Sequence, residues 1–227
     1  MEWMVFLNGD ETDLRELAKC LQRSDLTIEK DNESYYLKST FFSSLTSSQE
    51  VREKANEILI PINAGIKIEL GAPRPIGVDR VLQINPNGVN KGIISRESKF
   101  CIRVPNDTFN PQNFFLPLLD IAKTDIQVAK MCQFINLDLN SWFTLYNILE
   151  ILEEDQFKPI MRCGIHKKEA DRFTHTADNY RILGVKSRHA KDKNAIPPEN
   201  PMTLSEAQEF IKMLIKEWLD EKGKKMM

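Results

Sequence analysis

The sequence predicts an α+β protein of two domains, residues 1–105 and 106–227. Strand and helix patterns alternate over the first hundred residues, whereas the patterns that follow residue 111 are helical. Between the two parts, residues 105–111 contain two prolines, two asparagines and one aspartate, a composition typical of a linker. We therefore expect an α+β sandwich domain followed by an all-α helical bundle.

The first domain opens with a short apolar run and a capped amphipathic segment. Alternation of apolar and polar residues is typical of half-buried strands, and apolar residues three and four apart are typical of a helix. These patterns predict a strand at 3–8, a helix capped by Asp10 and ending near Gln22, and a hairpin of strands 26–30 and 35–39 that turns at Asp31-Asn32.

A second helix and a second hairpin complete this domain. Ser47 and Glu50 have the spacing of a capping box, which marks the start of a helix that runs toward Pro61. Because proline lacks an amide hydrogen, we expect a break or kink there and then a strand over 64–70. The last two predicted strands are 78–84 and 93–104, joined across Asn85-Pro-Asn-Gly88.

The order β-α-β-β-α-β, with one or two further strands, resembles a ferredoxin-like α+β sandwich. Short connections between such elements favour an antiparallel or mixed sheet with helices on one face. This fold hosts many unrelated functions, so the resemblance implies none of them. The sequence lacks the glycine-rich motifs that bind dinucleotides or nucleotide phosphates.

Helical periodicity dominates the second domain. The expected helices are one over 112–136 that begins with Asn110 and Pro111, one over 141–154 capped by Asn140, one over 168–176, and a last one from a Thr203 cap to Gly223. Glu206 completes a capping box with Thr203. The apolar stripes of these helices indicate packing in a core rather than a cofactor site.

The composition is that of an ordinary globular protein, with 41% hydrophobic and 28% charged residues. The net charge of −2 provides no overall attraction to nucleic acid or to an anionic membrane. The sequence has no stretch apolar enough for a membrane span, and its first residues lack the pattern of a signal peptide. We expect a soluble, cytoplasmic protein without membrane association.

The four cysteines are widely spaced and form no CxxC pair, a pattern that favours a reducing compartment. Three of them lie in apolar stretches and are expected to be buried thiols: Cys20, Cys101 and Cys132. A metal site can be drawn from the fourth, Cys163, with the three histidines His166, His175 and His189. Because this spacing matches no compact zinc module, we expect neither a metal nor a cofactor.

One segment is distinguished by its charge. Residues 162–193 hold nine Lys/Arg and four Asp/Glu, a net charge of +5, and they include all three histidines of the chain. Such a segment is either an anion-facing surface or a solvated loop. Four acidic residues lie near the C-terminal end of the preceding helix, where the helix dipole disfavours them: Glu150, Glu153, Glu154 and Asp155. We therefore predict that the basic segment packs near these carboxylates.

Two chemical interpretations of the basic segment remain. His189 with Arg188 or Arg181 has the groups that cleavage of an RNA phosphodiester requires, because histidine transfers protons near neutral pH and arginine binds phosphate. On a helix Arg172 and His175 share a face and are further anion-facing candidates. Alternatively, Arg188 and His189 anchor the proline-rich loop by bonding backbone carbonyls, or Glu150 and Glu153.

The second half of the chain, about residues 112–220, resembles the helical HEPN domains (higher eukaryotes and prokaryotes nucleotide-binding). Many HEPN domains are metal-independent RNases of toxin–antitoxin and phage-defence systems, and they act as dimers in which two R-x(4–6)-H motifs face one another. Here seven residues separate Arg181 from His189, Arg188 directly precedes His189, and Ile182 replaces the usual polar residue. The resemblance implies a homodimer with His189 and Arg181 or Arg188 at the site.

The chain also resembles an uncharacterised family of bacterial proteins that share an ARHA-like patch followed by P-M-T-L-x-E-A. We expect a non-catalytic interaction or regulatory protein of bacterial type, acting in a defence or stress system. The alternative is a HEPN-like, metal-independent RNase that uses the Arg/His pair. The expected partner is accordingly another protein or RNA.

Overall fold

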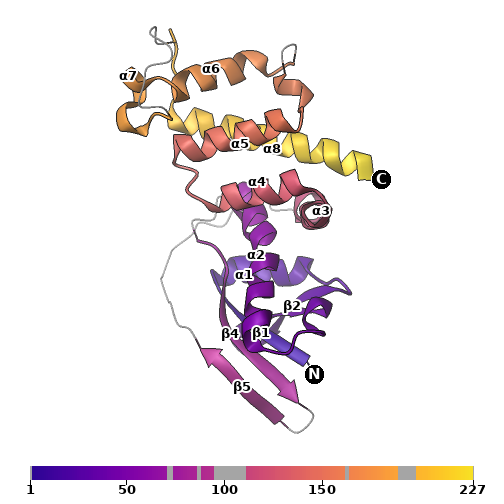
Figure 1. The fold of residues 1–227 in the computed structure, drawn as a ribbon. Helices are drawn as coiled ribbons and strands as arrows, with labels where there is room; N and C mark the ends of the chain where they lie inside the picture. The colour runs from indigo at the N-terminus through magenta and orange to yellow at the C-terminus, as the bar shows by residue number, and fades with distance from the viewer. Residues whose placement is uncertain are drawn as a thin grey trace. The chain divides into compact units, whose positions relative to one another are not determined.

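The computed structural model describes residues 2–70, 74–85, 88–94, 111–161, 164–188 and 198–226. The chain divides into two compact units, Met1–Leu119 and Asp120–Met227 (Figure 1). The class is mixed α+β, as predicted, and the strands that the structure describes lie in unit 1. The predicted domain boundary between residues 105 and 106 lies outside the described residues.

The described strands of unit 1 form one antiparallel sheet in the order β2-β3-β1-β4-β5. They are β1 (Glu2–Asn8), β2 (Leu26–Asp31), β3 (Ser34–Ser39), β4 (Gly77–Asn85) and β5 (Gly88–Ile94). The register places Val5 opposite both Leu37 and Val81, and all three are fully buried. Because side chains alternate between the faces of a strand, this row marks the core face of the sheet.

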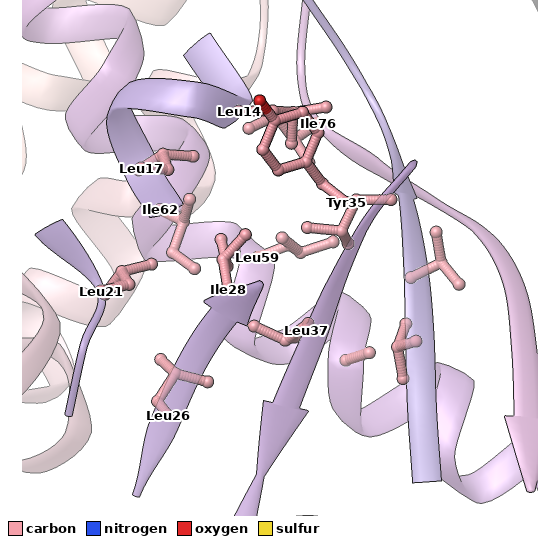
Figure 2. Close-up of a cluster of buried hydrophobic side chains, with 14 of the residues drawn as sticks. Leu14, Leu17, Leu21, Leu26, Ile28, Tyr35, Leu37, Leu59, Ile62 and Ile76 are labelled. Atoms are coloured by element: carbon pink, nitrogen blue, oxygen red, sulfur yellow. The ribbon is translucent and has the colours of Figure 1, made fainter. Parts of the chain in front are cut away.

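Two helices contribute side chains to the core on that face, α1 (Glu11–Cys20) and α2 (Ser48–Leu70). Figure 2 shows Leu17 of α1 and Ile62 of α2 near Ile28 of β2. The short helix η1 (Thr40–Phe42) adds Phe42, and Leu119 belongs to the same cluster. The predicted arrangement of an antiparallel sheet with helices on its core face is therefore present in unit 1.

The local start signals of these helices are confirmed. Asp10 caps α1 by accepting a hydrogen bond from the Thr12 amide at 2.8 Å. Ser47 and Glu50 form the reciprocal capping box, with the Ser47 amide donating to Glu50 at 3.0 Å. The turn of the first hairpin begins one residue later than predicted, at Asn32, whose φ of +53° is in the left-handed region.

Helix α2 contradicts the prediction of a break at Pro61 and a strand over 64–70, since it continues to Leu70. Its core-facing positions keep the helical spacing on both sides of Pro61: Val51, Ala55, Leu59, Ile62 and Ile66. The lost amide hydrogen bond is outweighed by burial of this continuous face. The apolar alternation after Pro61 misled the prediction because Ala64 and Ile68 are buried as well.

The second hairpin is tighter than predicted. Strand β5 begins at Gly88, which pairs with Asn85, rather than at residue 93. Asn85 and Gly88, which the prediction placed in the turn, are therefore paired strand residues, and residues 89–92, which it left between the turn and the second strand, belong to β5. The rest of the predicted strand, residues 95–104, lies outside the described residues.

The regular elements described in unit 2 are all helical. The α-helices after residue 110 are α3 (Pro111–Thr124), which crosses the border between the units, α4 (Ile126–Asn136), α5 (Trp142–Glu154), α6 (Lys167–Ala177), α7 (Tyr180–Leu183) and α8 (Leu204–Met226). Two short 3₁₀ turns, η2 (Lys158–Ile160) and η3 (Gly184–Lys186), flank α6 and α7. No helix among the described residues is long and apolar enough to cross a membrane.

The predicted helix over 112–136 is in fact two helices, separated at Asp125. The backbone of Asp125 is extended, and its carboxylate accepts hydrogen bonds from the amides of Gln127 and Val128. An aspartate that caps a new helix competes with continuation of the old one. Ser141, not Asn140, caps α5 through a bond from the Thr144 amide.

The last helix has the predicted capping box but not the predicted end. The Thr203 amide donates to Glu206 at 2.7 Å, and the Glu206 amide donates to Thr203 at 3.2 Å. Helix α8 passes through Gly223 to Met226. The side chain before the glycine, Lys222, is bound to Asp125 and Asp155, which holds the final turns against the unit.

Phe173 of α6 lies at the centre of the core of unit 2 and is fully buried. Its ring centroid lies 5.6 Å from that of Trp142, 6.2 Å from that of Tyr146 and 6.3 Å from that of Phe210. These rings come from α5 and α8, so one aromatic cluster joins three helices. Because α6 belongs to the basic segment, residues 162–193, this cluster fixes part of that segment against α5 and α8.

Candidate functional site

Arg188 is the residue of the basic segment that the structure places most clearly. Its guanidinium donates to Glu150 at 2.6 Å and lies over the ring of Tyr146, with 3.7 Å between the Cζ atom and the ring centroid. Its amide donates to the carbonyl of Ala177. The prediction that the basic segment packs near the carboxylates at the end of α5 is confirmed for this pair.

Two buried polar residues, Asp178 and Asn179, directly follow Ala177, whose carbonyl accepts from the Arg188 amide. Asn179 is fully buried and caps α7, because its side chain accepts hydrogen bonds from the amides of Arg181 and Ile182. Burial raises the pKa of Tyr146, and the charge of Asp178 raises it further while that of Arg188 lowers it. We name this group the polar junction of α5, α6 and α7; it comprises Tyr146, Glu150, Asp178, Asn179 and Arg188.

Sequence reasoning missed three members of the polar junction. Tyr146 was interpreted as core because it lies on the apolar stripe of its helix. Asp178 and Asn179 follow a helical pattern directly, and an asparagine in that place is a signal for the cap of a new helix. That signal could have found Asn179, whereas nothing local shows that Tyr146 supplies a ring for an arginine 42 positions later.

Arg172, a predicted anion-facing residue, is bound within unit 2. It donates to the backbone carbonyl of Asn200 at 2.8 Å and to the carboxylates of Glu206 at 3.0 Å and Glu169 at 3.2 Å. The hydrogen bond to Glu206 is the main reason that the pKa of Arg172 is raised. Arg172 therefore ties the loop after the prolines to α6, a task that the sequence had suggested for Arg188 and His189.

The histidines are not gathered at the polar junction in the described part of the chain. His166 approaches Glu217 of α8, with 2.9 Å between Nε2 and Oε2. His175 is exposed on α6, and Arg181 is exposed on α7. Neither His166 nor His175 shares a hydrogen bond with Arg188 among these residues. His189 lies outside the described residues.

The described cysteines are poorly suited to nucleophilic chemistry. Cys132 is buried and Cys20 is half-buried, while Cys101 and Cys163 lie outside the described residues. Burial raises the pKa of Cys132 to about 12 and that of Cys20 to about 11. Both are thiols rather than thiolates at neutral pH. Among the described residues, no group of three or more His, Cys, Asp or Glu is placed to hold a metal ion.

The polar junction is built to hold chain segments together. The charge of Arg188 is balanced by Glu150, and its flat guanidinium is held against the Tyr146 ring. A phosphate that approached Arg188 would have to compete with the Glu150 carboxylate and would be repelled by it. The contacts therefore favour a stabilising role for Arg188 over anion binding.

We expect Arg188→Ala to lower the free energy of unfolding by about 1–2 kcal/mol, because the change removes an ion pair and a cation–π contact at a side chain only 24% exposed. Lys186→Ala, at an exposed position of the same segment, is the matched control and should cost less than about 0.5 kcal/mol. Urea unfolding followed by tryptophan fluorescence measures both. Equal losses for the two variants would contradict the stabilising role.

No family model matches the chain, and no curated protein or solved structure matches it. The function therefore has to be inferred from the residues of the chain itself. The contacts of Arg172 and Arg188 bear most directly on the hypotheses that the sequence raised.

Proposed function

We propose that this chain is a non-catalytic protein-interaction or regulatory module of bacterial type, acting in the cytoplasm in a defence or stress system. The observation that carries the proposal is that Arg188 and Arg172 are engaged by carboxylates, a ring and backbone carbonyls of their own unit. An RNA-cleaving site needs cations that are free to meet phosphate. The bacterial and defence setting comes from the sequence resemblances alone.

The proposal includes an assignment of fold for each unit. The chain order β-α-β-β-α-β and the sheet order β2-β3-β1-β4 of unit 1 support a ferredoxin-like sandwich. The packing of α5, α6 and α8 around Phe173, and of α4 on α5, supports a helical bundle for unit 2. Neither fold implies a reaction, and both are used widely as binding modules.

The alternative is a HEPN-like, metal-independent RNase, in which His189 acts with Arg188 or Arg181 across a homodimer. One observation favours it: Arg188, which directly precedes His189, binds Ala177 through its amide, next to the buried polar residues Asp178 and Asn179. Buried polar groups around a charged side chain are common at catalytic sites as well as in structural networks.

An RNA-cleavage assay in the presence of EDTA separates the two functions. We expect the wild-type chain to cleave a labelled single-stranded RNA no faster than buffer alone. The variants His189→Ala and Arg188→Ala are assayed beside it, with their melting temperatures recorded. Metal-independent cleavage that is lost in His189→Ala at an unchanged melting temperature would overturn the non-catalytic proposal and establish the RNase.

A further inference from the structure

A groove runs along the hairpin of α4 and α5. Five residues, 137–141, connect these helices, and such a short connection makes them antiparallel neighbours. The groove has a volume of about 530 Å³, and its lining includes Lys130 and Phe134 of α4 and Asn147, Glu150, Ile151 and Glu153 of α5. It lies within unit 2, and its two ends differ in chemistry.

One end of the groove is acidic. Glu150 is paired with Arg188, and Glu154 is paired with Lys130 at 3.0 Å. The carboxylate of Glu153 has no hydrogen bond or ion pair within the described parts of the chain. Burial raises the pKa of Glu153; the charge of Lys167 lowers it, and that of Glu150 raises it, so that the net shift is upward. A cation from outside would favour the charged form of Glu153, so this end of the groove is complementary to lysine or arginine.

The other end of the groove is apolar. Because α4 and α5 are antiparallel, the C-terminal residues of α4 and the first residues of α5 lie at the same end. Phe134 lines the groove, and the same end of the hairpin carries two exposed large side chains, Leu137 at 51% and Phe143 at 57%; Phe143 lies one turn before the lining residue Asn147. The apolar face that α5 presents to the core is separate and buried. An exposed aromatic at the rim of a groove is typical of a protein interface.

We propose that the groove between α4 and α5 binds an amphipathic helix of a protein partner, with an apolar side chain at the Phe134 and Phe143 end and a lysine or arginine at Glu153. Glu150 and Glu154 lie seven and eleven residues after Phe143, which corresponds to about 10–16 Å along a helix. The partner helix therefore carries its apolar and basic residues two to three turns apart, a helix-in-groove arrangement.

This inference rests on the proposed interaction function and names its partner class. A nucleic acid is a poorer occupant, because Glu150 and Glu154 already bind Arg188 and Lys130, and the carboxylate of Glu153 would repel phosphates. A small anion is disfavoured for the same reason. The occupant that complements both ends is a basic and apolar peptide segment.

Two synthetic helical peptides test the proposal on the full chain. One has leucines at one end and lysines two to three turns away; the other has the same composition with these positions shuffled. Fluorescence anisotropy gives the Kd of each labelled peptide. We expect the patterned peptide to bind about tenfold more tightly than the shuffled one. Glu153→Lys should raise the Kd of the patterned peptide by about tenfold. Phe143→Ser should also raise this Kd.

Glu209→Lys is the matched control, since Glu209 is an exposed glutamate of the same unit, on α8, that pairs with Lys212. It should leave the Kd unchanged within about twofold. Equal binding of the two peptides, no binding of either, or equal weakening by Glu209→Lys and Glu153→Lys would overturn the groove assignment. So would a single-stranded RNA that binds wild type more tightly than the patterned peptide does and loses that binding in Phe143→Ser.

The outcomes for the groove and for the proposed function can be told apart. His189-dependent RNA cleavage would reject the non-catalytic function whatever the peptides do. If the chain does not cleave RNA and the patterned peptide binds no better than the shuffled one, only the assignment of the groove and of its partner class is rejected. Circular dichroism of each variant confirms that a change in Kd is not a loss of folding.

Discussion

Phe173→Ala is expected to lower the free energy of unfolding of unit 2 by about 3–5 kcal/mol. Phe173 is fully buried, and its ring touches an aromatic cluster drawn from α5 and α8. The change removes a whole ring from the centre of the unit and leaves a cavity that three helices cannot close without moving. The effect should be among the largest of any single substitution in this unit.

Urea unfolding of the full chain, followed by fluorescence, measures this loss, because Trp142 lies 5.6 Å from Phe173 and reports on the cluster directly. Phe143→Ala is the matched control: the same residue type in the same unit is 57% exposed and should cost less than about 0.5 kcal/mol. The control also separates stability from binding, since Phe143 belongs to the proposed groove. Similar losses for the two variants would contradict the assignment of Phe173 to the core.

Lys222→Met is expected to lower the free energy of unfolding by about 2–3 kcal/mol at neutral pH. This is somewhat less than the ~3–5 kcal/mol that is typical when a fully buried ion pair loses one partner. Lys222 is 12% exposed and binds Asp125 and Asp155, each of which is 27% exposed. Trp218 donates to Asp155 at 2.7 Å, which completes the network. Methionine keeps the methylene packing but leaves two carboxylates without their cation.

The pH dependence of this loss follows from the pKa shifts. Burial alone would raise the pKa of Asp125, but the hydrogen bond from Lys222 and the amide of Val128 outweigh it and lower the pKa. Since the folded pKa lies below the unfolded value of about 3.9, the stability from Asp125 is complete above that pH and is lost as the pH falls through the folded pKa. The cost of Lys222→Met should therefore shrink in acid.

The titration of Lys222 determines how far into the alkaline range the same network contributes to stability. Burial would lower its pKa, but the hydrogen bonds to Asp125 and Asp155 raise it overall. Its contribution to stability is therefore complete below the unfolded pKa of about 10.4 and is lost as the pH rises through the folded pKa.

Urea unfolding at pH 7 and at pH 3 tests the assignment on the acid side, with Lys212→Met on the same helix as the control. If Lys222→Met lowers the free energy of unfolding as much at pH 3 as at pH 7, the ion pairs with Asp125 and Asp155 are not the source of the loss.

The sequence predicted best those features that depend on residues close together in the chain. The caps at Asp10, at Ser47 with Glu50, and at Thr203 with Glu206 are all present, because a cap needs only a side chain and an amide two or three positions away. The periodic helices α5 and α8 are predicted for the same reason. Their apolar spacing records which face is buried.

The candidate site was predicted only in part. Opposite charge alone indicated that the basic segment meets the carboxylates of α5, and Arg188 with Glu150 bears this out across 38 positions. The binding of Arg172 to the carbonyl of Asn200 carried no signal, because every residue has a carbonyl group and its place is set by the fold. The groove between α4 and α5 likewise could not be predicted from the sequence, since its lining residues come from two separate helices.

By itself, then, the sequence determined the mixed α+β class, the starts of α1, α2 and α8, and the charge contrast between the basic segment and the end of α5. Tertiary structure alone decided that α2 continues through Pro61 and that α8 passes Gly223. The physical reason is that a proline or a glycine changes local preferences by only a few kcal/mol. Burial of a long apolar face, or an ion pair such as that of Lys222 with Asp125, is large enough to reverse that preference.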